Sequence, residues 1–136
     1  MAPFRLAAED RDRLLAAARE ALKNAYAPYS GIRVGAALLT RQGNLYSGVN
    51  VEIASYGLTV CAERAAIGAA VAGEGASMLI QALAVVNEAG TSCPPCGACR
   101  QVILELGHEA VVIFVGPEGL EERTASELLP AAFRLP

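Results

Sequence analysis

Two short motifs in this 136-residue sequence contain the residue types that metal chemistry needs. The first begins at Cys61 and includes Glu63, and the second places Cys96 and Cys99 with two residues between them. Cysteine thiolates at such a separation favour a tetrahedral zinc ion. Three sulfur ligands leave the fourth position for a water molecule, which is the arrangement of a catalytic zinc. The glutamate beside the first ligand would then transfer the protons of that water.

Arg64 follows Cys61 by three residues, so both side chains would lie on one face of a helix. Three thiolates give a zinc site a net negative charge, which weakens the metal as a Lewis acid. Hydrogen bonds from the Arg64 guanidinium to the sulfurs would draw off part of that charge. An exposed helix charge is the simpler interpretation of this residue. Because its surroundings are apolar, we favour an interaction with the thiolates.

Cys93 allows a different interpretation, in which the zinc site is closed by four cysteines and is only structural. Cys93, Cys96 and Cys99 are each separated by two residues. The two prolines before Cys96 favour an extended chain, which interrupts the helical spacing. A closed site would also leave Glu63 without a purpose. We therefore expect three ligands, with Cys93 as a small buried residue or a free thiol, and keep the structural zinc module as the non-enzyme alternative.

Apolar periodicity predicts the elements that position these motifs. We expect an amphipathic helix over residues 8–26 and a buried helix over residues 59–72, capped by Thr59 or a neighbour. A third helix is expected over residues 96–106. Strands are expected at residues 33–40, 45–51, 79–86 and 110–115, with a further short strand within 124–129 that runs into a helical turn.

These elements predict an α/β fold with three layers, α/β/α, and a mixed sheet of about five strands. Helices would cover both faces of the sheet. The small residues at positions 35–37 would let another element pack closely against one strand. The length predicts one domain over residues 1–136.

Composition limits the possible partners. The net charge of −3 supplies no basic surface for nucleic acid and suits a small neutral substrate. No apolar run reaches the ~18 residues of a membrane-spanning helix, and the N-terminus shows no signal peptide, so we expect a cytoplasmic protein without a membrane partner. In that compartment the four cysteines indicate metal binding or catalysis before disulfides. The hydrophobic content of 54% favours burial between subunits.

Both motifs resemble those of the zinc-dependent cytidine deaminases, in their small homotetrameric form with three cysteine ligands. The matching residues are Cys61-Ala62-Glu63 and Pro95-Cys96-Gly97-Ala98-Cys99-Arg100-Gln101. Further landmarks of the family are Ala25-Tyr26-Ala27-Pro28-Tyr29-Ser30, Val34-Gly35-Ala36-Ala37, Asn50-Val51-Glu52 and Leu128-Leu129-Pro130. The similarity extends from about Ala21 to Phe133, which is nearly the whole chain.

The resemblance implies hydrolytic deamination of cytidine and 2′-deoxycytidine to uridine and 2′-deoxyuridine, a reaction of pyrimidine salvage. Such an enzyme is a hydrolase that acts on the C–N bonds of cyclic amidines, with one Zn²⁺ per subunit. Zinc lowers the pKa of its water, so that hydroxide can attack C4 of the base. Glu63 would serve as base and then as acid in the proton transfers.

The resemblance also implies the residues that bind the nucleoside. Asn50 and Glu52, which share one face of an extended segment, would hydrogen-bond the ribose hydroxyls. The backbone N–H of Ala62 would hold the base carbonyl. Phe133 would stack on the base in a neighbouring subunit. Ile32 stands where the family usually has a phenylalanine against the base, so it would form that contact without an aromatic face.

The resemblance leaves the substrate range open. Ile32 replaces the usual phenylalanine, and Ile53 stands where an asparagine commonly follows the motif of Glu52. These departures give some weight to a modified cytosine nucleoside such as blasticidin S. A homotetramer with sites completed by neighbouring subunits is implied as the assembly. A deaminase of DNA or RNA is not expected, because nothing in the sequence supplies a cationic channel.

Overall fold

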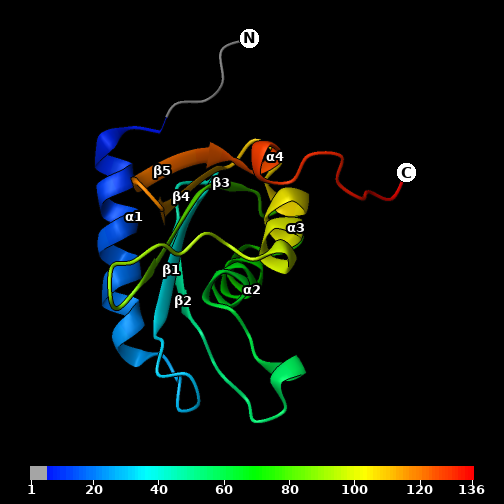
Figure 1. Cartoon of the computed structure of the whole chain (residues 1–136). Helices are drawn as coiled ribbons and strands as arrows, with labels where there is room; N and C mark the ends of the chain where they lie inside the picture. The colour runs from blue at the N-terminus through cyan, green and yellow to red at the C-terminus, as the bar shows by residue number, and fades with distance from the viewer. Residues whose placement is uncertain (1–5) are drawn as a thin grey trace.

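The computed structural model of the protein describes residues 6–136 as an α/β fold built on one mixed sheet (Figure 1). The five strands lie in the order β2-β1-β3-β4-β5 and have the bounds β1 Val34–Thr40, β2 Leu45–Val49, β3 Ile80–Asn87, β4 Val111–Gly116 and β5 Gly119–Thr124. β3 and β4 are parallel, and the other neighbouring pairs are antiparallel. The predicted mixed sheet of about five strands is confirmed.

Helices cover both faces of this sheet, as predicted. In Figure 1, α1 (Ala8–Ala21) lies on one side and α2 (Ala62–Glu74) and α3 (Gly97–Leu106) lie on the other. Because side chains alternate along a strand, β1 contributes to two hydrophobic clusters. Ala37 and Leu39 pack with α1, whereas Ala36 and Leu38 pack with α2 and α3. The three-layer arrangement therefore follows from one strand that is apolar on both faces.

Two glycines let the helices approach the sheet closely. A Cβ atom at Gly35 would lie 2.9 Å from Cβ of Leu22, directly after α1, as the small residues at 35–37 predicted. A Cβ atom at Gly48 in β2 would lie 2.7 Å from the carbonyl oxygen of Ala62, in the first turn of α2. The close approach at Gly48 was not predicted. It fixes the position of the helix end that carries the first motif.

The first helix is shorter than predicted. α1 ends at Ala21 and a 3₁₀ turn follows over Leu22–Asn24, so the expected helix over residues 8–26 is wrong at its end. Tyr26 instead pairs with the segment after β2. Its backbone N–H donates to the Asn50 carbonyl at 3.0 Å, and the Glu52 N–H donates to the Tyr26 carbonyl at 2.9 Å. Tertiary pairing thus overrides the helical pattern.

The structure also differs from the prediction at the start of α2 and at the end of β5. α2 begins at Ala62 with Cys61 as its N-cap, whereas Thr59 ends a 3₁₀ turn over Tyr56–Leu58 and accepts a hydrogen bond from the Ile53 N–H. The strand expected within 124–129 is wrong, because β5 ends at Thr124. Thr124 then caps the short helix α4 (Ala125–Leu128), with Glu127 completing a capping box.

Residues 1–5 belong to the predicted single domain over residues 1–136 but lie outside the described residues, and that domain assignment stays a prediction. Within residues 6–136, no helix combines the length and the apolar character that crossing a bilayer requires.

Candidate metal centre and active site

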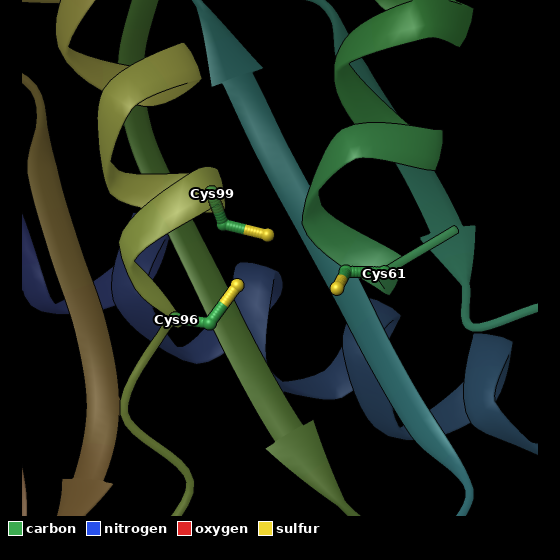
Figure 2. Close-up of side chains that lie close together, drawn as sticks. All are labelled: Cys61, Cys96 and Cys99. Atoms are coloured by element: carbon green, nitrogen blue, oxygen red, sulfur yellow. The ribbon is translucent and has the colours of Figure 1, made fainter. Parts of the chain in front are cut away.

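Two helix N-termini carry the three thiols. Cys61 is the N-cap of α2 and Cys96 is the N-cap of α3, both with extended backbone and without a side-chain capping hydrogen bond. Cys99 lies in the first turn of α3. Figure 2 shows the side chains of Cys96 and Cys99 directed toward the start of α2, where Cys61 lies. The unpaired N–H groups and positive dipole ends of both helices favour thiolates here.

The geometry of the three thiols fits a zinc ion. Their Sγ atoms all lie within 4.8 Å of one another. A tetrahedral zinc with sulfur ligands at ~2.3 Å needs sulfurs roughly 3.8 Å apart, so a small contraction would complete the set. Cys99 is buried, Cys61 is partly buried and Cys96 is exposed, which leaves one side accessible to a ligand.

Cys93 is not a member of this cluster. Within residues 6–136, Cys61, Cys96 and Cys99 form the only group of three or more His, Cys, Asp or Glu side chains close enough to hold one ion. The Cys93 side chain packs against the hydrophobic cluster beneath α2 and α3, and its backbone N–H donates to the Val115 carbonyl at 2.8 Å. This arrangement argues against a site closed by four cysteines.

Arg64 lies beside the thiols, as its spacing from Cys61 predicted. Its Nη2 atom donates to Sγ of Cys61 at 3.5 Å. Within the protein alone, the pKa of Cys61 is lowered to about 5, because the Cys99 thiol and then the Arg64 guanidinium donate hydrogen bonds to it. Donation to Cys61 in turn raises the pKa of Cys99. The buried Nε of Arg64 has no hydrogen-bond partner within residues 6–136.

Glu63 is buried in the first turn of α2, with only 5% of its surface exposed. Burial is the main cause that raises the pKa of its carboxyl group, and the negative charge of Cys61 adds to it. A carboxyl group with a raised pKa, held next to the thiols, is suited to accept and return protons near neutral pH.

The predicted nucleoside-binding residues do not share one hollow of the described chain. Ile32 and Cys93 line one hollow of about 690 Å³, while Glu52 lines another of about 330 Å³. Phe133 is 72% exposed and lines a third hollow against α3. Ala62 is fully buried at the start of α2. The described chain therefore does not bring Phe133 to the thiol cluster.

Asn50 is nearly buried, with 8% of its surface exposed. Its amide oxygen accepts from the Val34 N–H and its amide nitrogen donates to the Ile32 carbonyl, both at 2.8 Å. An asparagine amide offers two donors and two acceptor sites. One N–H and one lone pair therefore remain for a ligand.

The sequence did not predict two groups of polar contacts around the site. Ser30 hydrogen-bonds Glu52 and Ile32, although only its place in a family landmark drew attention to it. Arg100 and Gln101, directly after the last thiol, hold the C-terminal segment. Arg100 donates to the Leu128 carbonyl at 3.0 Å and Gln101 to the Phe133 carbonyl at 3.1 Å. Their place in the second motif was the available signal.

Comparison with known proteins assigns the chain to a class of zinc-binding proteins. Residues 8–115 match the family model described as the cytidine and deoxycytidylate deaminase zinc-binding region. That range covers more than half of the chain and includes the three thiols and Glu63. The fold and the site thus define a zinc-binding deaminase domain.

Individual relatives narrow the class. A cytidine deaminase from Halalkalibacterium halodurans is 47% identical over 91% of this chain and 94% of its own length. The crystal structure of cytidine deaminase from Mycobacterium tuberculosis superimposes with a TM-score of 0.83 at 42% identity, covering 93% of this chain and 98% of that one. A blasticidin-S deaminase from Bacillus cereus is 33% identical over 74% of this chain and 76% of its own length. The chain belongs to the family of zinc-dependent cytidine deaminases.

Proposed function

We propose that the protein deaminates cytidine and 2′-deoxycytidine, with water as co-substrate, to the corresponding uridines and ammonia. The observation that carries this proposal is a buried glutamate next to three thiols within 4.8 Å of one another. A structural zinc module needs the sulfurs but has no use for a carboxylate buried beside them. The similarity to proteins named cytidine deaminase supports the choice of substrate.

Each residue of the site has a role in this reaction. Cys61, Cys96 and Cys99 would hold the zinc ion, which when bound makes hydroxide available from water at neutral pH. Glu63 accepts the proton that water releases and delivers it to N3 of the base. It then takes the second proton of the added water from the hydroxyl on C4 and gives it to the departing amine, so that C4 becomes a carbonyl and ammonia leaves. Arg64 stabilises the thiolate of Cys61 by its hydrogen bond.

The remaining predicted residues would bind the nucleoside. We assign the base carbonyl to the backbone N–H of Ala62, whose position in the first turn of α2 leaves that group without an intrahelical partner. Glu52 and the free donor and acceptor of Asn50 would hydrogen-bond the sugar hydroxyls. Ile32 would contact the base from the exposed loop before β1, where 57% of its surface is accessible.

A modified cytosine nucleoside is the second candidate substrate. Ile32 and the partly exposed Ile53 are the two positions that favour it, and a blasticidin-S deaminase is among the relatives. The identity to that relative is 33%, against 47% for a cytidine deaminase, so cytidine is preferred. Ammonia release from cytidine, 2′-deoxycytidine and blasticidin S at equal concentrations separates the candidates. Faster release from blasticidin S would reverse the preference.

We also propose a cytoplasmic homotetramer in which neighbouring subunits complete the sites. Phe133, Tyr56 and Leu58 expose 72%, 77% and 66% of their surfaces, which is unusual for side chains of this size. Burial between subunits would remove that apolar surface from water, and it would allow Phe133 to reach the base bound by a neighbour. Four free cysteines suit a reducing compartment.

The test combines zinc content and turnover on the same purified protein. Wild-type protein should contain one zinc ion per chain and release ammonia from cytidine. Glu63→Gln should keep the zinc and lose at least about a hundredfold in kcat, since proton transfer contributes on that scale. Cys93→Ser is the matched control and should keep both zinc and turnover. Loss of zinc from Cys93→Ser, or full activity of Glu63→Gln, would refute the proposal.

A further inference from the structure

The hydroxyl group of Ser30 joins two residues of the proposed nucleoside site. Its oxygen accepts a hydrogen bond from the Ile32 N–H at 3.0 Å and lies 2.5 Å from Oε2 of Glu52. A backbone N–H can only donate, and an ionised carboxylate can only accept. The hydroxyl proton of Ser30 must therefore be directed at Glu52, which fixes the orientation of the whole chain of hydrogen bonds.

The loop before β1 occupies most of the accepting capacity of Glu52. Oε1 accepts from the N–H groups of Tyr29 and Ser30 at 3.0 and 3.1 Å, which uses both of its lone pairs. Oε2 accepts only the Ser30 hydroxyl and keeps one lone pair. These donors, with the Ser30 hydroxyl first, lower the pKa of Glu52 and keep it ionised. Glu52 lines a hollow that Tyr56 and Thr59 also line.

We propose that Ser30 is a positioning residue that sets Oε2 of Glu52 to accept a hydrogen bond from a hydroxyl group of the nucleoside sugar. The inference rests on the proposed function, because it assumes that Glu52 meets the sugar. Ser30 touches neither the base nor the reacting atoms. It acts by holding one carboxylate oxygen in place, and so it contributes to the recognition of substrates that carry the sugar hydroxyl.

A purely structural role for the hydroxyl is disfavoured by the backbone of the same loop. The N–H of Gly31 donates to the Ala27 carbonyl at 3.0 Å, which closes the turn without the Ser30 side chain. Gly31 has a φ of 73°, a conformation that glycine adopts without strain. The Asn50 amide separately fixes the Ile32 carbonyl. Removal of the hydroxyl should therefore leave the loop folded.

The test compares cytidine with analogues that lack sugar hydroxyls. In Ser30→Ala, kcat/KM for cytidine should fall about three- to tenfold, mostly through KM, because one hydrogen bond to a charged group is weakened. The kcat/KM for 2′,3′-dideoxycytidine should change less than about twofold, since this analogue has no 2′ or 3′ hydroxyl for Glu52 to bind. The 2′-deoxy and 3′-deoxy analogues then show which hydroxyl is bound. Ser30→Thr keeps a hydroxyl and should restore the wild-type ratio between cytidine and the dideoxy analogue.

Two controls separate this role from general damage. Ser77→Ala removes an exposed hydroxyl in the turn after α2 and should leave every substrate unaffected. In a Glu52→Gln background, Ser30→Ala should not lower kcat/KM for cytidine any further relative to kcat/KM for 2′,3′-dideoxycytidine. If Ser30→Ala unfolds, Ser30→Cys replaces it, because a thiol has a similar shape to the hydroxyl but is a weaker donor. The same ratio of kcat/KM between cytidine and 2′,3′-dideoxycytidine is then measured.

The outcomes distinguish the inference from the proposed function. Wild-type protein that releases no ammonia from cytidine would refute the function itself. With an active wild type, an equal fold loss for cytidine and 2′,3′-dideoxycytidine in Ser30→Ala would overturn the positioning role, and so would no loss at all. A loss confined to hydroxyl-bearing nucleosides, reversed by Ser30→Thr, would support it.

Discussion

The contact between β2 and the first turn of α2 should control whether the three thiols can hold zinc. A Cβ atom at Gly48 would lie 2.7 Å from the Ala62 carbonyl oxygen and closer still to the backbone nitrogen of Ala66. Ordinary contact begins at about 3.4 Å and the Ala66 nitrogen would lie at 2.3 Å, so Gly48→Ala must separate strand and helix by about 1.1 Å. The obstacle is backbone, which cannot rotate out of the way.

The helix end should yield before the strand does. β2 is paired with β1 over a register of five residue pairs, whereas the segment that leads into α2 at Cys61 is held by a single bridge between Val60 and Val51. Metal–ligand distances tolerate deviations of about 0.2 Å, which is less than the required shift. We therefore expect Gly48→Ala to lose about ten- to a hundredfold in zinc affinity, the range seen when groups around ligands are disturbed. The free energy of unfolding should fall by about 1–3 kcal/mol.

The assay titrates a chelator against the zinc-loaded protein and measures denaturant unfolding on the same samples. Gly68→Ala is the matched control, because it adds the same methyl group to α2 where no atom lies within 4 Å. That exchange should leave zinc affinity unchanged and stabilise the helix by up to about 1 kcal/mol. If Gly48→Ala bound zinc as tightly as the wild type, the claim that this contact positions Cys61 would be refuted.

Two further predictions test the surroundings of the zinc site. Arg64→Gln should bind zinc about ten- to a hundredfold more weakly in the same chelator titration, because Cys61 loses a charged donor; unchanged affinity would assign Arg64 to the helix surface. Phe133→Ala should lose roughly fivefold in kcat/KM for cytidine, about 1 kcal/mol of stacking. If Phe133 acts on a neighbouring subunit, co-expression of Phe133→Ala with Glu63→Gln should form mixed oligomers with some fully active sites. If the co-expressed sample shows only the sum of the activities of the two separate variants, Phe133 does not act in the neighbour's site.

The sequence predicted the thiols and Glu63 because the relevant signals are local. Ligand spacing and helix N-termini both act over a few residues, so Cys61, Cys96 and Cys99 could be expected at two helix starts. The two prolines before Cys96 also correctly indicated that Cys93 lies apart from the cluster. The exact start of α2 was wrong by a few residues, since Thr59 resembles a cap but ends a 3₁₀ turn instead.

Features that depend on long-range contacts could not be predicted in the same way. β5 is an edge strand whose residues are mostly exposed, so the sequence Gly119–Thr124 lacks the apolar alternation that reveals a strand. Tyr26 fits the helical pattern of α1, yet its backbone pairs with Asn50 and Glu52. The importance of Gly48 is visible only once α2 is packed on β2.

The spacing of Asn50 and Glu52 predicts a shared face but not which groups already occupy it. Both side chains serve the loop before β1, yet they differ in what a substitution would disturb. Removing the Asn50 amide would leave the Ile32 carbonyl and the Val34 N–H without their hydrogen-bond partner. The loop that carries Ile32 next to the base would then shift. Loss of the amide should weaken the binding of every nucleoside through the displaced loop, in addition to the loss of any hydrogen bond that Asn50 makes to a sugar hydroxyl. Glu52 is more accessible and keeps a free acceptor, so changes at Glu52 or Ser30 should discriminate among sugars, which makes them the sharper probes of recognition.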